Sequence, residues 1–176
     1  MNLYTESNCL IEINNLHIQY GDKVILRDVG NDAIPFRIND IHREGMKQGQ
    51  TVAVLGRSGR GKSTLFRSLV GLEQPTKGRI IIPKDFKGTD YKNIEEGDVG
   101  FVQQTYPLSR NQSVYDMLRD AVAMGDDKNN PDEIINKYLE EWGLKDQRNH
   151  YPKQLSGGQR QRVAIIEQLL CSHYFI

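Results

Sequence analysis

The sequence is poor in cysteine, in long apolar runs and in net charge, and each absence excludes a class of protein. Cys9 and Cys171 are two cysteines without a spacing pattern, so a disulfide scaffold is excluded and both are expected to stay thiols in a reducing cytoplasm. Apolar runs such as Ile80–Ile82 are far shorter than the roughly 20 residues that cross a bilayer. Lysine plus arginine and aspartate plus glutamate both number 23, so no overall charge attracts nucleic acid.

Two further absences concern targeting and metal binding. Residues 1–10, MNLYTESNCL, have neither a basic nor an apolar segment, so no secretory signal is expected. The histidines are scattered without metal-ligand spacing, so no zinc site is expected; they are His17, His42, His150 and His173. At 176 residues the chain is the size of one domain, or of part of one.

The first half of the chain has the patterns of β structure. Residues 9–29 alternate apolar and polar side chains on both sides of Gly21-Asp22, which predicts an antiparallel hairpin. The polar stretch 30–50 is hard to interpret and is expected to contain at most a short strand at 36–38. Three further strands are predicted from apolar, β-branched runs, over 51–56, 79–83 and 99–104.

The second half has the periodicity of helices. One helix is predicted after the N-cap Ser113, and another after Asn130 with Pro131 at its first position and Gly143 as its end. A last helix is expected to begin within residues 156–159 and to run through RQRVAIIEQLL. Tyr138 and Trp142 lie at helical spacing and are expected to pack in the core.

The segment GRSGRGKST fits the phosphate-loop pattern G-x-x-x-x-G-K-[ST], between a predicted buried strand and a predicted helix. In such a loop the glycines turn backbone N–H groups onto a phosphate, and the helix N-terminus adds its positive dipole end. Lys62 is expected to reach the β- and γ-phosphates and Ser63 to ligate Mg²⁺. The expected ATP-binding residues of the loop are Gly56, Arg57, Ser58, Gly59, Arg60, Gly61, Lys62, Ser63 and Thr64.

A second glycine-rich helix start stands at residues 155–159, LSGGQ, followed by Arg160-Gln161-Arg162. It can present N–H groups and a serine hydroxyl to a phosphate but has no lysine, so it looks like half of a site. The string closely resembles the signature of ATP-binding cassette (ABC) ATPases. The resemblance implies that the segment contacts the ATP of a partner chain through Leu155, Ser156, Gly157, Gly158 and Gln159.

The resemblance also implies roles for residues that no motif marks. Gln104 falls at the family's Q-loop, which reaches Mg²⁺ and the attacking water. It is therefore a predicted catalytic residue, as is Lys62, and a predicted Mg²⁺ ligand, as is Ser63. Gln103 is the alternative Q-loop residue. Tyr20 falls where the family stacks an aromatic ring on adenine. Arg57 and Arg60 are departures from the usual loop and are expected to point outward, because only backbone groups are needed there.

The resemblance covers the chain from about Cys9 to its last residue and implies an α/β fold, a P-loop NTPase of the ABC type. Its expected parts are an N-terminal antiparallel β part, an incomplete RecA-like parallel core and a helical signature subdomain. The expected division is residues 1–104 for the β part and phosphate-loop core, 105–160 for the helical subdomain and 161–176 for a return segment.

The function implied by the resemblance is that of the ATP-binding subunit of an ABC transporter, an ATPase that uses ATP and Mg²⁺. Its implied partners are membrane permease subunits and a head-to-tail copy or paired ATPase subunit, at the cytoplasmic face of the membrane, without nucleic acid and without insertion into the bilayer. The alternatives are a non-hydrolysing nucleotide-binding remnant and an ABC-type ATPase of DNA repair or chromosome organisation.

In ABC ATPases the signature helix leads to an apolar strand that ends in Asp-Glu, the carboxylates that support Mg²⁺ and orient water. Residues 173–176, HYFI, resemble the opening of that strand, and the carboxylates are not in the sequence. A truncated or fragmentary chain is therefore expected, one that binds ATP without hydrolysing it at a useful rate.

Overall fold

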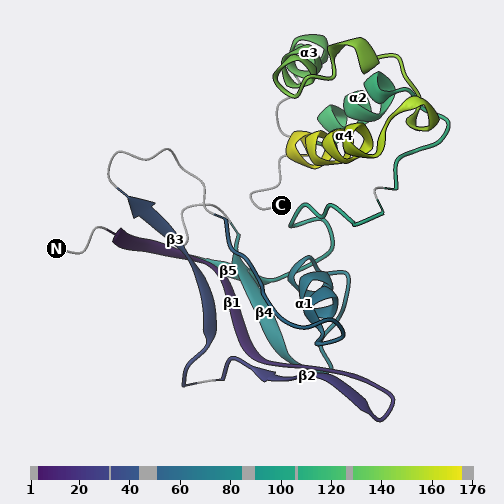
Figure 1. Ribbon diagram of the computed structural model, residues 1–176. Coiled ribbons are helices and arrows are strands. Elements are labelled where there is room, and N and C mark those ends of the chain that lie inside the picture. Colours follow the sequence, from purple (N-terminus) through teal and green to yellow (C-terminus); the bar gives the residue numbers. More distant parts are fainter. Residues whose placement is uncertain are drawn as a thin grey trace. The chain divides into compact units, whose positions relative to one another are not determined.

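The computed structural model describes residues 4–31, 33–43, 51–84, 90–105, 107–125 and 129–171, which fall into two compact units (Figure 1). The first unit, Met1–Asp98, contains the β structure and the helix of the phosphate loop, and the second, Val99–Ile176, is helical. The first unit ends at Asp98, whereas the predicted β part extends to residue 104.

An antiparallel sheet forms the first unit, and the long strand β1 (Tyr4–Tyr20) pairs with most of the others (Figure 1). The strands follow the order β2-β1-β4-β5, and β3 also pairs with β1. Their bounds are Lys23–Val29 for β2, Phe36–Arg43 for β3, Lys77–Pro83 for β4 and Tyr91–Asn93 for β5. The predicted hairpin around Gly21-Asp22 is confirmed as β1 and β2, and the short strand predicted at 36–38 extends to Arg43.

The buried face of β1 changes parity in the middle of the strand. After the irregularity in the pairing with β3 at Cys9–Ile11, Ile11 and Ile13 are buried on odd positions, whereas Leu16 and Ile18 are buried on even ones. The switch occurs at Asn15, which has a φ of 50° and lies where the pairing with β4 shifts its register. An extra residue of this kind turns every later side chain to the other face, so one strand can bury apolar side chains at both ends.

The bulge in β1 requires a glycine on the neighbouring strand. Gly78 has a φ of +81°, and a Cβ there would lie 2.2 Å from the Asn15 carbonyl oxygen and 2.4 Å from that of Asn14. We expect Gly78→Ala to reduce the free energy of unfolding by about 2–4 kcal/mol, because it adds a backbone clash to a left-handed conformation. Urea unfolding of both proteins measures the difference.

Gly97→Ala is the matched control for this substitution. Gly97 also has a positive φ, +96°, but a Cβ there would meet nothing within 4 Å. It should lose only the roughly 1 kcal/mol of conformational strain. Equal losses at the two glycines would contradict the role of the contact with Asn15.

Two of the predicted strands are wrong. Residues 51–56 form no strand, and Val52 and Leu55 are 50% and 91% exposed. Residues 99–104 also form no strand. The Phe101 N–H donates to the Gln168 side-chain oxygen at 3.0 Å rather than to the backbone carbonyl of a neighbouring strand. A strand buried on both faces exists only when neighbours accept its backbone hydrogen bonds, and the described residues provide none for these two segments. β5, in a stretch predicted as loop, was missed.

The second unit packs helices around one core. Its elements are α2 (Val114–Met124), α3 (Pro131–Glu141), the 3₁₀ turns η1 (Lys145–Gln147) and η2 (Pro152–Gln154), and α4 (Gly157–Leu170). All three predicted helices are confirmed. Fully buried side chains from each helix form the core, among them Leu118, Ile135, Leu139, Val163 and Ile166. Tyr138 and Trp142 pack against this core, as predicted.

The helix ends follow the predicted capping residues with one difference. The Ser113 hydroxyl caps α2 by accepting from the Asp116 N–H at 3.2 Å, and the Asp116 carboxylate accepts from the Ser113 N–H at 3.1 Å. Asn130 precedes Pro131 in α3 but adopts a left-handed conformation, and its amide donates to the Glu133 carboxylate rather than accepting from the helix backbone. Local sequence therefore located the helices well, because caps and periodicity act within a few residues.

Candidate functional site

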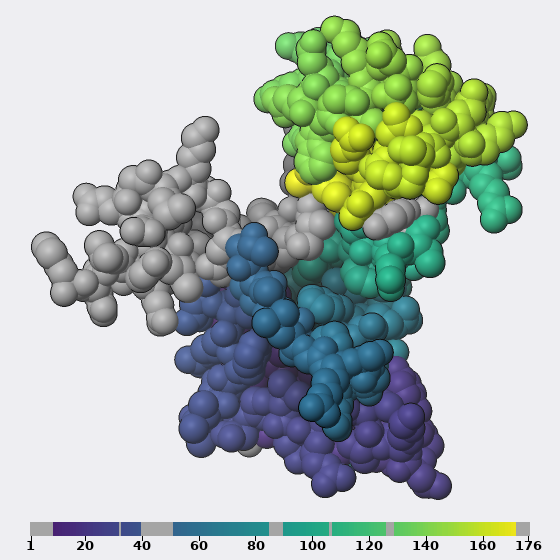
Figure 2. Space-filling model, viewed as in Figure 1, coloured from purple at the N-terminus to yellow at the C-terminus, as the bar shows by residue number. Residues whose placement is uncertain are grey.

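The phosphate loop, Gly56–Thr64, runs into α1 (Lys62–Leu69) at the surface of the first unit (blue in Figure 2). Gly59 and Gly61 have φ values of +76° and +83°, so two glycines turn the chain before the helix. At Gly61 a Cβ would lie 3.0 Å from the Leu26 side chain and 3.2 Å from that of Ile25. The loop therefore rests directly on β2, and glycine is required at this contact as well as by the left-handed backbone.

The Lys62 side chain closes the loop. Its ammonium donates to the Gly56 carbonyl at 2.8 Å and to the Arg57 carbonyl at 2.9 Å. The two bonds hold the positive charge across the mouth of the turn and leave a third N–H proton for another acceptor. Arg57 and Arg60 are exposed, as predicted, and the loop contains no acidic residue. Its electrostatic character is therefore that of an anion site.

The first turn of α1, which begins at Lys62, has unpaired backbone donors. The Leu65 N–H is the first in α1 with an intrahelical acceptor, the Gly61 carbonyl at 2.8 Å. Among the described residues no acceptor faces the N–H groups of Lys62, Ser63 and Thr64. Unpaired N–H groups at a helix start, next to a lysine, are the arrangement that binds phosphate.

Tyr20, predicted from the resemblance alone, lies beside the phosphate loop. The nearby Glu73 carboxylate is the main cause that raises the pKa of the Tyr20 hydroxyl, and Thr64 of the loop acts on it in the opposite direction. Tyr20 is 48% exposed. The structure thus brings Tyr20 together with the loop. Sequence reasoning missed Glu73, and no local signal could have found it, because Tyr20 ends β1 whereas Glu73 lies in the turn after α1.

The signature segment, Leu155–Gln159, forms the N-terminus of α4 in the second unit. The Ser156 hydroxyl accepts from the Gln159 N–H at 3.3 Å, and the Gln159 side-chain oxygen accepts from the Ser156 N–H at 2.8 Å. Leu155 is buried in the helical core, whereas a Cβ on Gly157 or Gly158 would meet open space. The segment is therefore a rigid cap with an open backbone at its tip.

Gln103 and Gln104 lie in the second unit, at the end of the segment 99–104 that is predicted as a strand. Gln104 is exposed in a turn rather than at a strand end. Its role as the Q-loop residue stays a prediction.

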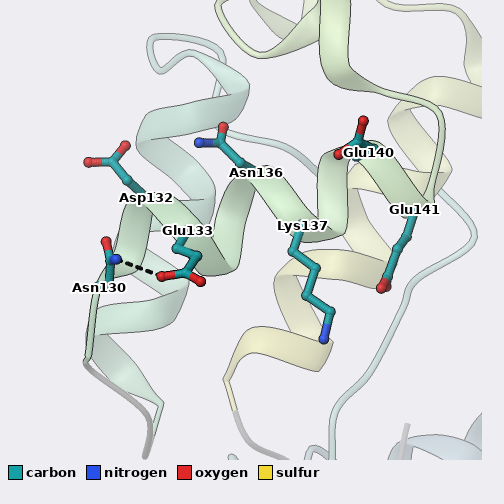
Figure 3. A pocket seen from close by; sticks show the side chains of 7 residues that line it. All are labelled: Asn130, Asp132, Glu133, Asn136, Lys137, Glu140 and Glu141. Atoms are coloured by element: carbon teal, nitrogen blue, oxygen red, sulfur yellow. Dashed lines mark hydrogen bonds between the residues drawn. The ribbon is translucent and has the colours of Figure 1, made fainter.

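A shallow concavity on the outer face of α3 does not suit a nucleotide. Its lining side chains come from one helix and its N-cap, with four carboxylates and one lysine (Figure 3). Asn130 donates to Glu133 at 2.7 Å within it. Acidic side chains repel polyphosphate, so the phosphate loop is the better candidate site.

The fold and the loop together define a P-loop nucleotide-binding class of chain, and comparison with known proteins specifies the family. A model of the ABC transporter family matches residues 41–176. The methionine import ATP-binding protein MetN 1 of Listeria monocytogenes is 40% identical over 128 residues, which cover 70% of this chain and 38% of that protein. The sulfate/thiosulfate import ATP-binding protein CysA of Escherichia coli is 37% identical over 166 residues, 90% of this chain and 41% of that protein. The chain therefore belongs to the ABC transporter family.

Solved structures agree on the fold. An ATP-binding subunit of an ABC transporter has a TM-score of 0.70 at 24% identity, covering 93% of this chain and 63% of the other. cbiO1 of Clostridium perfringens, part of the transporter complex cbiONQ, has a TM-score of 0.65 at 26% identity, with 94% and 63% covered. The predicted ABC-type fold class is confirmed. The chain spans about two fifths of the length of the curated relatives, 38% and 41% of those named above. Across the described residues, no helix has the length and apolar character needed to cross a bilayer.

Proposed function

We propose that the chain binds ATP with Mg²⁺ as the nucleotide-binding part of an ABC transporter and supplies both halves of the family's composite ATPase site. The observation that carries this proposal is the phosphate loop, which combines the Lys62 ammonium with a helix start whose first N–H groups have no backbone acceptor among the described residues. These donors match the oxygens of a polyphosphate, which accept several hydrogen bonds and carry negative charge.

Each residue of the site has a defined task in this proposal. The N–H groups of Lys62, Ser63 and Thr64 hold phosphate oxygens, and the Lys62 ammonium offsets the charge of the β- and γ-phosphates. The Ser63 hydroxyl is exposed at the first turn of α1 and fits as a Mg²⁺ ligand, together with Gln104. Bound Mg²⁺ supplies charge neutralisation across the phosphates. Tyr20 offers its exposed ring to the adenine.

The signature segment supplies the second half of the site, in a partner chain. It has backbone donors and Ser156 but no cation that could hold a nucleotide alone, so it is expected to close over ATP held by another copy in a head-to-tail dimer. Permease subunits complete the transporter at the cytoplasmic face of the membrane. Both relatives are named for import, which favours import here, and because their substrates differ we propose no substrate.

A complementation experiment tests the composite site. In a version of the chain long enough to hydrolyse ATP, Ser156→Arg and Lys62→Ala should each be inactive alone. A one-to-one mixture should recover about one quarter of the unaltered activity, because half of the random dimers then carry one intact composite site. Phosphate release by the separate and mixed proteins provides the measurement.

Ser109→Arg is the matched control for the signature variant, since Ser109 is an exposed serine of the same unit. It should retain activity without any partner. Mixed dimers that are shown to form but recover no activity would contradict the head-to-tail arrangement.

A further inference from the structure

Two arginines follow the signature segment on α4, and each of them bonds to a backbone carbonyl. The Arg160 guanidinium donates to the Leu155 carbonyl at 2.8 Å, within the same helix start. The Arg162 guanidinium donates at 2.8 Å to the carbonyl of Trp142, twenty residues earlier in the chain. Both arginine side chains are half-buried. These two positive charges are therefore engaged with the backbone of their own unit.

The Trp142 carbonyl belongs to the C-terminal end of α3. Trp142 is the C-cap of this helix, and the last turn of α3 contains no basic residue of its own. Carbonyls without an intrahelical donor and the negative end of the helix dipole make a cation favourable there. Gly143 follows with a φ of +64°, and a Cβ on it would lie 3.5 Å from the same Arg162 nitrogen. Arg162 thus lies directly against the end of α3 and supplies this cation.

The second bond of Arg162 goes to the signature segment. Its Nε donates to the Gly158 carbonyl at 3.4 Å, a longer bond than the one to Trp142. A planar guanidinium presents its N–H groups at fixed angles, so one side chain can connect two carbonyls and set the distance between them. Arg162 therefore joins the end of α3 to the first turn of α4.

The other bonds of the signature segment do not fix its direction. The capping bonds between Ser156 and Gln159 stay within one turn of α4, so they do not orient that turn relative to α3. Gly157 and Gly158 are exposed and have no side chain that could pack. Two glycines also leave the backbone more conformational freedom than other residues would. A bond from outside the turn limits this freedom.

We propose that Arg162 is a positioning residue for the signature segment: its bridge from Trp142 to Gly158 holds the exposed tip of α4 in the orientation that meets the nucleotide of a partner chain. The inference rests on the proposed function, since it assumes that the signature segment closes a composite site. It gives Arg162 a task different from that of Lys62, because Arg162 acts through the backbone of Gly158 and touches no phosphate.

The experiment measures the ATP-dependent association of two variants of the 176-residue chain. The Ser156→Arg chain keeps an intact phosphate loop and the Lys62→Ala chain keeps an intact signature segment, so with ATP and Mg²⁺ the pair forms one composite site. Sedimentation of one labelled chain, titrated with the other, gives the Kd of the pair. Arg162→Ala in the Lys62→Ala chain should weaken association about five- to twentyfold, because it removes a charged donor that holds the signature in use.

The same substitution in the other chain is the matched control. Arg162→Ala in the Ser156→Arg chain alters a signature segment that the pair does not use, so association should stay unchanged. A general loss of stability would weaken association in both placements alike. Arg162→Lys in the Lys62→Ala chain keeps the charge but loses the planar fork, and its effect should be intermediate. Arg110→Ala removes an exposed arginine of the same unit and should have no effect.

Hydrogen exchange without nucleotide separates positioning from phosphate binding. The Gln159 N–H donates to the Ser156 hydroxyl and the Arg160 N–H to the Ser156 carbonyl, so both amides report on the first turn of α4. Arg162→Ala should speed exchange at these two amides, because the turn opens more often when its bridge to α3 is absent. A residue that only bound phosphate would leave this exchange unchanged.

Equal weakening in the two placements, no weakening in either, or unchanged exchange in Arg162→Ala would overturn the role of Arg162 and leave the composite site standing. Absence of ATP-dependent association between the Ser156→Arg and Lys62→Ala chains would instead overturn the head-to-tail arrangement, and the inference with it.

Discussion

Replacement of Lys62 by alanine is expected to remove the rise in melting temperature that ATP with Mg²⁺ causes in the 176-residue chain. A ligand at 100 times its Kd stabilises a protein by about 2.7 kcal/mol, which corresponds to roughly 5–10 °C in a chain of this size. Lys62→Ala removes the ammonium that lies across the loop on the Gly56 and Arg57 carbonyls. The variant loses both the charge that meets the phosphates and the bonds that close the loop. Thermal melting with and without nucleotide measures the effect.

Lys153→Ala is the matched control, because Lys153 is an exposed lysine of the second unit. It should retain the full shift. An unchanged shift in Lys62→Ala would show that the nucleotide binds elsewhere. Loss of the shift in both variants would point to a general effect of charge rather than to this site.

Phosphate release by residues 1–176 is expected to stay far below that of a version that also carries the family's Asp-Glu strand and later histidine loop. The phosphate loop and Ser63 supply positioning and part of a metal shell, but not the carboxylate that orients water. Absence of a general base typically reduces a rate about 10²- to 10⁴-fold. Phosphate release by the two purified chains, each with and without Lys62→Ala, gives the comparison.

Glu167 is a poor substitute for the missing carboxylate. It lies half-buried on α4, where burial and the nearby Asp120 carboxylate raise the pKa of Glu167. In the proposed head-to-tail arrangement, the helix that carries Glu167 faces the nucleotide of the partner chain rather than the one on its own phosphate loop. Comparable Mg²⁺-dependent turnover in both chains, lost with Lys62→Ala, would mean that the shorter chain finds its carboxylate elsewhere and that our proposal is wrong.

Much of the fold was predictable where the forces are local. The Ser113 cap, Pro131 at the start of α3 and the Gly21-Asp22 turn act over a few residues, so their sequence patterns located real helix starts and a real hairpin. The phosphate-loop and signature motifs are local in the same sense. They identified two helix N-termini with open backbone donors before any contact between distant residues was known.

The wrong predictions share a different cause. Residues 51–56 and 99–104 have the composition of buried parallel strands, but a strand needs hydrogen-bonding neighbours that composition alone does not provide. In the described residues the Phe101 N–H bonds to Gln168 of α4, and Leu55 remains exposed. β5 was missed because it is three residues long and polar, and only its pairing with β4 makes it a strand.

The sequence by itself determined the class of this protein, because the phosphate loop and the signature segment are short strings whose spacing encodes the donors that meet a phosphate. Only the tertiary structure decided which side chains surround those donors. The bulge at Asn15 needs Gly78, and Gly61 rests on Ile25 and Leu26. Each of these contacts joins segments distant in the chain, and the free energy of such a contact depends on geometry that appears only after the sheet has formed.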